Sequence, residues 1–304
     1  MELDENIEKE EIKRTFTSEQ LNLFDKMRNL PFEDKVEIAH KIVKEAFSKF
    51  KRLAVAFSGG KDSTVVLHIV RQYNPDIPVI FANTRVEMPE TIKFIRELKE
   101  KWNLNLIEVK GKYTFWQIVE KYGLPSTRFL TNSKIALASK GLTQLQGAPK
   151  CCWYLKEEPA LNMYRKKGIE CVFFGITWDE SYNRKWSIIK KGLLFYHTTH
   201  KHWKCYPIGY WSELDVWTYI EKNNIPVNPA YEKVDRVGCI VCTAYKDWEH
   251  DMARLYPALY KRICKILGIN TIDSFIKDTA NDTTDDTIVI NPVKHGQLKL
   301  NDFR

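Results

Sequence analysis

Apolar side chains recur every three or four residues through the first part of the chain, between charged ones. Because residues three and four apart share one face of a helix, this spacing predicts amphipathic helices within residues 1–50. We interpret this part as a helical N-terminal extension that carries no active-site residue. The apolar positions are Leu21, Phe24, Met27, Leu30, Val36, Ala39, Ile42, Val43 and Phe47.

From residue 51 onward, short apolar runs alternate with helical stretches. The runs LAVAF, IPVIFAN, LNLIEVK and ECVFFGIT have the length of buried strands, whereas STVVLHIVRQY and PETIKFIRELKEKW follow helical spacing. Strands that alternate with helices build parallel sheets covered by helices on both faces. The sequence therefore predicts an α/β fold with a doubly wound, mostly parallel sheet.

The C-terminal third is less regular. Ser212 stands as an N-cap before the helical run ELDVWTYIEKNN, and one further helix is expected over residues 247–267. For the polar tail from Thr279, three interpretations stay open: a lid, an edge strand or a mobile segment. We divide the chain into a helical extension (1–50), a catalytic domain (51–245) and a C-terminal helical and irregular region with its tail (246–304).

Composition narrows the class of protein. The 304 residues carry a net charge of +8, with 44% hydrophobic and 12% aromatic side chains, so the chain can bury a full core. The positive charge is spread along the chain and suits an anionic partner such as a nucleotide, with nucleic acid also open. No run approaches the roughly 18 to 20 apolar residues of a membrane span, and the acidic start differs from a signal peptide. We expect a cytoplasmic protein without a membrane partner.

A glycine loop, SGGKDS at Ser58–Ser63, joins the first predicted strand to a helix. Gly59 and Gly60 allow backbone N–H groups to approach phosphate oxygens, and the helix N-terminus adds partial positive charge. Lys61 adds a full charge. The flanking serines and the Lys61-Asp62 pair distinguish the loop from an ordinary glycine turn, and its spacing differs from that of the P-loop. The pattern predicts a nucleotide phosphate site.

Four of the seven cysteines form two pairs, Cys151-Cys152 and the CxxC pair Cys239 and Cys242. An odd number of cysteines in a reducing compartment argues against a disulfide framework. Four thiolates that converge suit zinc or an iron–sulfur cluster. Adjacent cysteines diverge and fit a single zinc ion poorly, whereas a cubane presents separate irons. The pairs favour a 4Fe-4S cluster, and zinc is the main rival.

The glycine loop resembles the SGGxDS signature of the PP-loop ATP pyrophosphatases at every fixed position. This resemblance implies an adenine nucleotide α-hydrolase-like fold that binds ATP and Mg²⁺ and releases diphosphate through an adenylated intermediate. It also implies that Lys61 and Asp62 are catalytic, with Asp62 helping to position Mg²⁺. The implied nucleotide contacts in the loop are Ser58, Gly59, Gly60, Lys61, Asp62 and Ser63.

Other stretches are similar to the adenylylsulfate and phosphoadenylylsulfate (PAPS) reductase branch of that family. They are FANTRVEMPET, PKCCWY, GITWDESYNRK, YPIGYWSELDVWTYIEKNNIPVNPAY and VGCIVC. The resemblance implies that the four paired cysteines hold the cluster and that Glu87 and Arg184 contact the nucleotide. Arg85 is a further candidate for phosphate, whereas Glu90 suits the start of its helix.

Two departures separate the chain from these reductases. Their catalytic cysteine lies in a Cys-Gly motif near the C-terminus, whereas this sequence has no cysteine after Cys264, which we expect to be a buried structural thiol. Where the branch often has an arginine after the glycine of GITWDESYNRK, this chain has Thr177 and Trp178. We therefore expect substrate recognition to differ.

Histidines and tryptophans gather before the last predicted helices. His197, His200 and His202 are interpreted as a solvated loop, because no cluster of carboxylates or cysteines accompanies them. Tryptophans and lysines in the same stretch could stack on unpaired bases. Trp217 is expected in the core, since it falls in a regular helix.

These patterns favour an ATP-dependent sulfurtransferase or thiolation enzyme that acts on nucleic acid, either in DNA phosphorothioation or in tRNA thiolation. A cysteine desulfurase is the expected sulfur donor, and a homo-oligomer stays open. One alternative is an adenylylsulfate or PAPS reductase that releases sulfite. Another is a non-catalytic subunit that binds a nucleotide or nucleic acid.

Overall fold

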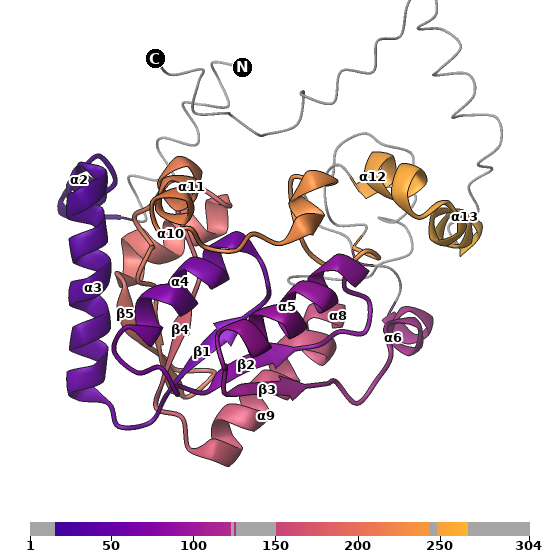
Figure 1. The fold of residues 1–304 in the computed structure, drawn as a ribbon, viewed down its shortest axis with the longest axis horizontal. Coiled ribbons are helices and arrows are strands. Elements are labelled where there is room, and N and C mark those ends of the chain that lie inside the picture. The colour runs from indigo at the N-terminus through magenta and orange to yellow at the C-terminus, as the bar shows by residue number, and fades with distance from the viewer. Residues whose placement is uncertain (1–15, 123–124, 126–149, 243–247, 267–304) are drawn as a thin grey trace, which may run out of the picture. The chain divides into compact units, whose positions relative to one another are not determined.

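The computed structural model describes residues 16–122, 125, 150–242 and 248–266 (Figure 1). Contacts group the chain into two compact units, each described separately below. The first comprises residues 1–82, 92–109 and 160–228, and the second comprises 83–91, 110–159 and 229–304. The polar tail and the first 15 residues lie outside the described residues. No helix of the described part is long and apolar enough to cross a membrane.

The first unit is built on a six-stranded sheet in the order β3-β2-β1-β4-β6-β5. All neighbouring strands are parallel except β5, which runs antiparallel to β6. This confirms the predicted doubly wound, mostly parallel sheet, with the order growing in both directions from β1. The strands are β1 (Leu53–Phe57), β2 (Val79–Ala82), β3 (Leu106–Val109), β4 (Cys171–Phe174), β5 (Leu194–His197) and β6 (His202–Cys205).

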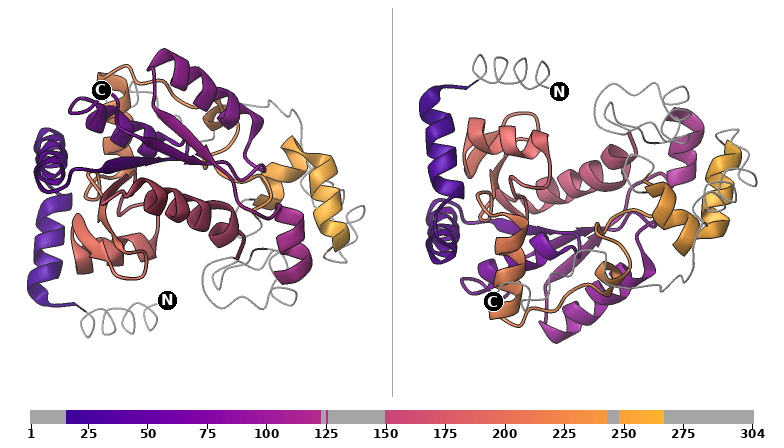
Figure 2. Two further views of the ribbon diagram at one scale, coloured as in Figure 1. Left: turned by 90° about the horizontal axis from the view of Figure 1, so that it is seen from below. Right: turned by 90° about the horizontal axis from the view of Figure 1, so that it is seen from above.

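Alternate residues of β1 face two different cores, as expected for a strand covered on both faces. Leu53, Val55 and Phe57 join the cluster formed with α3, α4, α5 and α11, whereas Ala54 joins the cluster formed with α9. Figure 2 shows α4 and α5 on one side of the sheet and α9 on the other. The helices are α2 (Ser18–Arg28), α3 (Phe32–Lys49), α4 (Lys61–Arg71), α5 (Pro89–Lys101), α9 (Glu158–Lys167), α10 (Tyr182–Lys191) and α11 (Glu213–Lys222).

The N-terminal helices pack on the first unit through one face each. A capping box between Thr17 and Gln20 begins α2, and α3 buries Ala39, Val43 and Ala46 in the main core. Lys35 of α3 forms a buried ion pair with Asp215 of α11 at 2.7 Å. The predicted helices are confirmed for the described part of residues 1–50.

The histidine segment is a β-hairpin rather than the solvated loop we expected. Its strands β5 and β6 pair His197 with His202, and His202 is buried, with 4% of its surface exposed. The strands are only four residues long and contain histidine and lysine, so their apolar alternation is weak. Edge pairing within the sheet stabilises them, and a sequence pattern does not report that contribution.

The second unit contains short helices around its own core. Phe115 and Ile118 of α6 pack there with Leu155, Trp248 and Ile263. The single helix expected over 247–267 is two helices, because Pro257 has no N–H to continue the hydrogen-bond ladder. The elements are α6 (Phe115–Tyr122), α8 (Lys150–Cys152), the π-helix Trp153–Glu157, the 3₁₀-helix Pro229–Glu232, α12 (Trp248–Leu255) and α13 (Pro257–Ile266).

Candidate functional site

The glycine loop (Ser58–Ser63) turns directly from β1 into α4. Gly59 has φ +74°, a conformation that favours glycine, and Gly60 is the extended N-cap of the helix. The hydroxyls of Ser63 and Thr64 donate to the Gly60 carbonyl at 2.9 and 3.0 Å. Helix N-terminal N–H groups have no partner within the helix, so the loop ends at a site suited to an anion.

The side chains of the loop are held by contacts within it. The hydroxyls of Ser58 and Ser63 lie 3.1 Å apart, and the Lys61 ammonium lies 3.1 Å from Asp62 Oδ2. Lys61 also lies 3.4 Å from the carboxylate of Glu213. The other carboxylate oxygen of Asp62, Oδ1, is buried and has no hydrogen-bond partner among the described residues. A buried acceptor without a partner is costly, so Asp62 Oδ1 is suited to a cation or a donor on a bound ligand.

Two residues outside the loop fix its position, and sequence reasoning missed both of these roles. A Cβ at Gly175, just after β4, would lie 2.4 Å from the Ser63 nitrogen, so only glycine fits there. The buried side chain of Asn228 donates to the Gly59 carbonyl at 3.0 Å. A glycine at the end of a predicted strand was the available signal for Gly175. Asn228 lies in an irregular segment that gave none.

Arg184 lies in the same unit as the glycine loop, in the first turn of α10. Ser181 caps that helix by accepting from the Arg184 N–H at 3.4 Å, and the Arg184 guanidinium forms an ion pair with Glu180. Trp178 stands where the family that the chain resembles often has an arginine, and it packs edge to face against Phe24 of α2. The position at which this sequence departs from the reductases therefore contacts an N-terminal helix.

The cysteine group (Cys151, Cys152, Cys239 and Cys242) lies entirely in the second unit. All four thiols are reduced and half-buried. Cys151 and Cys152 follow each other in α8, immediately before the π-helix, and the Cys242 N–H donates to the Cys239 carbonyl at 3.1 Å. A hydrogen bond from Cys151 lowers the pKa of Cys152 to about 7 and raises that of Cys151. Repulsion from Cys242 and Cys239 makes a smaller contribution to raising the pKa of Cys151.

Glu87 lies beside Cys239. The two residues form an antiparallel β-bridge, and the Cys239 thiol lies 3.7 Å from the Glu87 carboxylate. Thr84 donates to the same carboxylate at 3.0 Å, and the Lys156 ammonium lies 3.6 Å from it. Within its unit Glu87 therefore contacts Cys239, Thr84 and Lys156, and the nucleotide contact implied by the resemblance stays a prediction.

Lys156 is a neighbour of the cysteine group that sequence reasoning did not single out. Attraction to Cys239, and to a smaller extent to Glu87, raises the pKa of Lys156. Burial raises the pKa of Cys239 to about 12. Lys156 follows Cys152 by four residues in a helical segment, and this spacing puts both on one face. That spacing was the available signal.

The donor chemistry of the cysteine group fits an iron–sulfur cluster or zinc, since four thiols from two pairs lie in one unit. However, the described residues contain no group of three or more His, Cys, Asp or Glu side chains arranged to hold a metal ion. The cluster therefore stays a prediction.

Arg85 and Glu90 have structural contacts within the second unit. Arg85 has φ +64°, and its guanidinium donates to the carbonyls of Gly111 and Tyr113 at 2.8 and 2.7 Å. Glu90 lies in the first turn of α5 and forms an ion pair with Lys233. Cys264 is fully buried in α13, as expected of a structural thiol.

Comparison with known proteins gives one family and several relatives. The model of the phosphoadenosine phosphosulfate reductase domain matches residues 52–245. An uncharacterised protein of Methanocaldococcus jannaschii is 31% identical over 72% of this chain and 42% of its own length, and a second from that organism is 28% identical over 77% and 54%. The chain thus spans about half the length of these two relatives.

Two further similarities concern proteins with a stated activity. An adenosine 5'-phosphosulfate reductase of Bacillus cereus is 26% identical over 69% of this chain and 82% of its own length. The solved phosphate complex of PAPS reductase from Candida auris is 18% identical over 74% of this chain and 96% of that one, with a TM-score of 0.49.

Proposed function

This chain belongs to the phosphoadenosine phosphosulfate reductase domain family, and from that premise we propose that it is an ATP-dependent sulfurtransferase. In the proposed reaction, an acceptor oxygen attacks the α-phosphorus of ATP, and diphosphate leaves. A sulfur nucleophile then displaces AMP from the adenylated acceptor. When the nucleophile is a persulfide, a second thiol cleaves its S–S bond and a disulfide forms.

The observation that carries the proposal is the glycine loop with its unsatisfied carboxylate oxygen. The loop combines an open helix N-terminus with the charge of Lys61, and both stabilise negative charge on a leaving diphosphate. The buried Oδ1 of Asp62 supplies a hard oxygen ligand of the kind that Mg²⁺ prefers. These residues would hold ATP and Mg²⁺, and Arg184 would supply a further cation. The hydroxyls of Ser58 and Ser63 would turn from their contacts within the loop to donate to phosphate oxygens.

The cysteine group supports the sulfur step. The three cysteines outside the two pairs, Cys171, Cys205 and Cys264, are buried and therefore poorly placed to carry sulfur. Burial raises the pKa of Cys171 to about 12, so this thiol is not activated. A cluster on the cysteine group would supply a site for binding or activating sulfur. We further propose a nucleic-acid acceptor, in DNA or tRNA, and a cysteine desulfurase as the donor.

Release of diphosphate from ATP is the first test. The protein, purified without oxygen, is expected to release diphosphate when ATP, Mg²⁺ and a nucleic-acid acceptor are present. Lys61→Met and Asp62→Asn should each lower that rate by about 100-fold, the typical cost of removing one stabilising group. Lys93→Met is the matched control, because Lys93 is exposed and its ion pair within the described residues is with Glu97, four residues along its own helix. Equal rates in all four proteins would refute the proposed role of the loop.

A reductase is the second candidate, favoured by the similarity to the Bacillus cereus enzyme. In that reaction, two thiols reduce adenylylsulfate to sulfite and AMP and become a disulfide. Adenylylsulfate or PAPS with reduced thioredoxin would yield sulfite, whereas ATP would yield no diphosphate. Sulfite formation would overturn the sulfurtransferase proposal, and binding of ATP with neither product would favour a non-catalytic subunit.

A further inference from the structure

The first unit contains a cavity of about 430 Å³ that lies away from the glycine loop. Its lining includes Phe50, which precedes β1, Gly168 to Glu170, which precede β4, and His202, which begins β6. The cavity therefore opens at the amino ends of the parallel strands, whereas the glycine loop follows the carboxyl end of β1. Five residues of β1 separate the two edges, about 15 Å at the usual rise of a strand.

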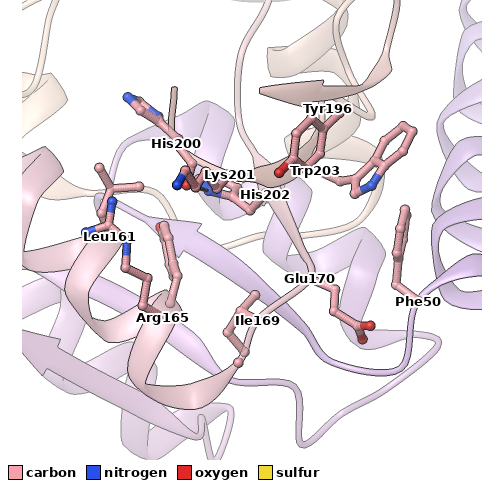
Figure 3. Close-up of a pocket in the computed structure, with 12 residues that line it drawn as sticks. Phe50, Leu161, Arg165, Ile169, Glu170, Tyr196, His200, Lys201, His202 and Trp203 are labelled. Carbon is pink, nitrogen blue, oxygen red and sulfur yellow. Dashed lines mark hydrogen bonds between the residues drawn. The ribbon is translucent and has the colours of Figure 1, made fainter. Parts of the chain in front are cut away.

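One end of the cavity is aromatic. Trp203 packs against Phe50 with ring centroids 5.3 Å apart and against Tyr196 at 5.9 Å (Figure 3). Tyr196 is 48% exposed, so part of this wall faces solvent. Aromatic walls of this kind favour a flat, apolar ring.

The other end is basic. Arg165 and Lys201 lie there with His200 in the view of Figure 3. Neither Arg165 nor Lys201 forms an ion pair within the described part of the chain, and the acidic residue of the cavity, Glu170, accepts from the backbone N–H groups of Lys51 and Arg52. These charges favour an anionic group and disfavour a cationic ligand.

His202 supplies a specific polar contact. Its Nδ1 lies 3.3 Å from the His200 carbonyl, which can only accept, so Nδ1 carries the proton and Nε2 has a free lone pair. That Nε2 is buried and has no hydrogen-bond partner in the described residues. Burial lowers the pKa of His202 to about 4, so the ring is neutral near pH 7. The three histidine rings of the hairpin are stacked rather than converging, with centroids 4.0 and 5.9 Å apart, so they do not form a metal site.

We propose that this cavity is a second binding site, separate from the glycine loop, for a small aromatic acid that carries a hydroxyl or amino group. The ring would lie against Trp203 and Phe50, and the acid group would lie near Arg165 and Lys201. The hydroxyl or amino group would donate to His202 Nε2. A volume of this size accommodates a small organic molecule.

The test is calorimetric titration with 4-hydroxybenzoate and two analogues that each lack one group, benzoate and phenol. We expect 4-hydroxybenzoate to bind, with benzoate and phenol each weaker by about tenfold, the loss of one hydrogen bond or charge contact. Phe50, Trp203 and His202 contribute to packing, so Lys201→Asn and Arg165→Gln are the main variants. Asparagine tolerates the positive φ of 58° at position 201. Each variant should weaken binding of the two acids and leave binding of phenol unchanged.

Two further variants separate this site from the glycine loop. Lys61→Met should leave the affinity for 4-hydroxybenzoate unchanged, and Lys201→Asn should leave diphosphate release unchanged. His202→Asn should remove the preference for 4-hydroxybenzoate over benzoate. The inference is overturned if 4-hydroxybenzoate does not bind, if all three probes bind equally, or if the Lys201 and Arg165 variants bind as the unchanged protein does. Loss of binding in Lys61→Met would place the probe at the glycine loop and would also overturn it.

Discussion

The glycine loop and the cysteine group bring their residues together in different ways. The loop is one contiguous turn whose backbone fixes its own side chains through the strand before it and the helix after it. The cysteine group and its neighbour Glu87 come from three separate segments, represented by Glu87, Cys152 and Cys239, which are joined by a β-bridge and by side-chain contacts. A contiguous site depends on backbone geometry and close packing, whereas an assembled site depends on the contacts that hold its segments together. Substitutions can test this difference.

The largest expected effect comes from Lys35→Met, which breaks the buried ion pair with Asp215. Helix α11 carries both Asp215 and Glu213, and Glu213 contacts Lys61, so this pair also anchors a neighbour of the glycine loop. Removing one partner of a buried pair leaves an uncompensated charge and should lower the free energy of unfolding by about 3 to 5 kcal/mol. Denaturant titration measures the change.

Lys222→Met is the matched control for Lys35→Met. Lys222 pairs with Glu33 at the same distance of 2.7 Å, but both side chains are more than half exposed. The control should change the free energy of unfolding by less than about 1 kcal/mol. Similar losses in both variants would show that burial does not determine the contribution of the pair.

Gly175→Ala should have the next largest effect and should act on the glycine loop. The new Cβ would lie within 2.6 Å of three backbone atoms of Asp62 and Ser63, so the loop must shift. A displacement of this size in a catalytic loop typically lowers the rate by about 100-fold. The rate of diphosphate release measures this effect. Gly238→Ala is the control, because its Cβ meets no atom within 4 Å, and an equal loss in both would contradict the role of close packing.

The sequence predicted the glycine loop more completely than the cysteine group and its neighbours, because the loop is contiguous and the other site is assembled from separate segments. The strand, loop and helix around Lys61 were all predicted, because the apolar pattern and the glycines are local signals. The cysteine pairs were also visible, but Lys156 and Thr84 became part of the site only through tertiary contacts. The β5–β6 hairpin was missed for a similar reason, since pairing at the edge of the sheet, not local pattern, orders its histidines.

Lys156→Met tests the assembled site. It removes the ammonium that lies 3.6 Å from the Glu87 carboxylate, whose side chain is only 5% exposed. Because the substitution leaves a buried carboxylate without its charged partner, it should lower the free energy of unfolding by about 1 to 3 kcal/mol. Thermal unfolding of the metal-free protein measures it. Lys150→Met, at an exposed lysine with no ion pair in the described part, should have little effect, and a larger loss there than in Lys156→Met would refute the assigned contact.

The smallest expected effect concerns the Glu90–Lys233 ion pair, which ties two segments of the second unit. The hydrogen bond from Lys233 lowers the pKa of Glu90 below its usual 4.5 in the folded state. The unfolded state therefore binds more protons just below pH 4.5, so the stabilisation is present above that pH and is lost as the pH falls through the lower, folded pKa. Lys233→Met should reduce the free energy of unfolding by about 0.5 kcal/mol at pH 7 and by less at pH 3. Unfolding of both proteins across this pH range measures the difference, and a loss that is constant with pH would show that Lys233 acts through packing rather than through the charge of Glu90.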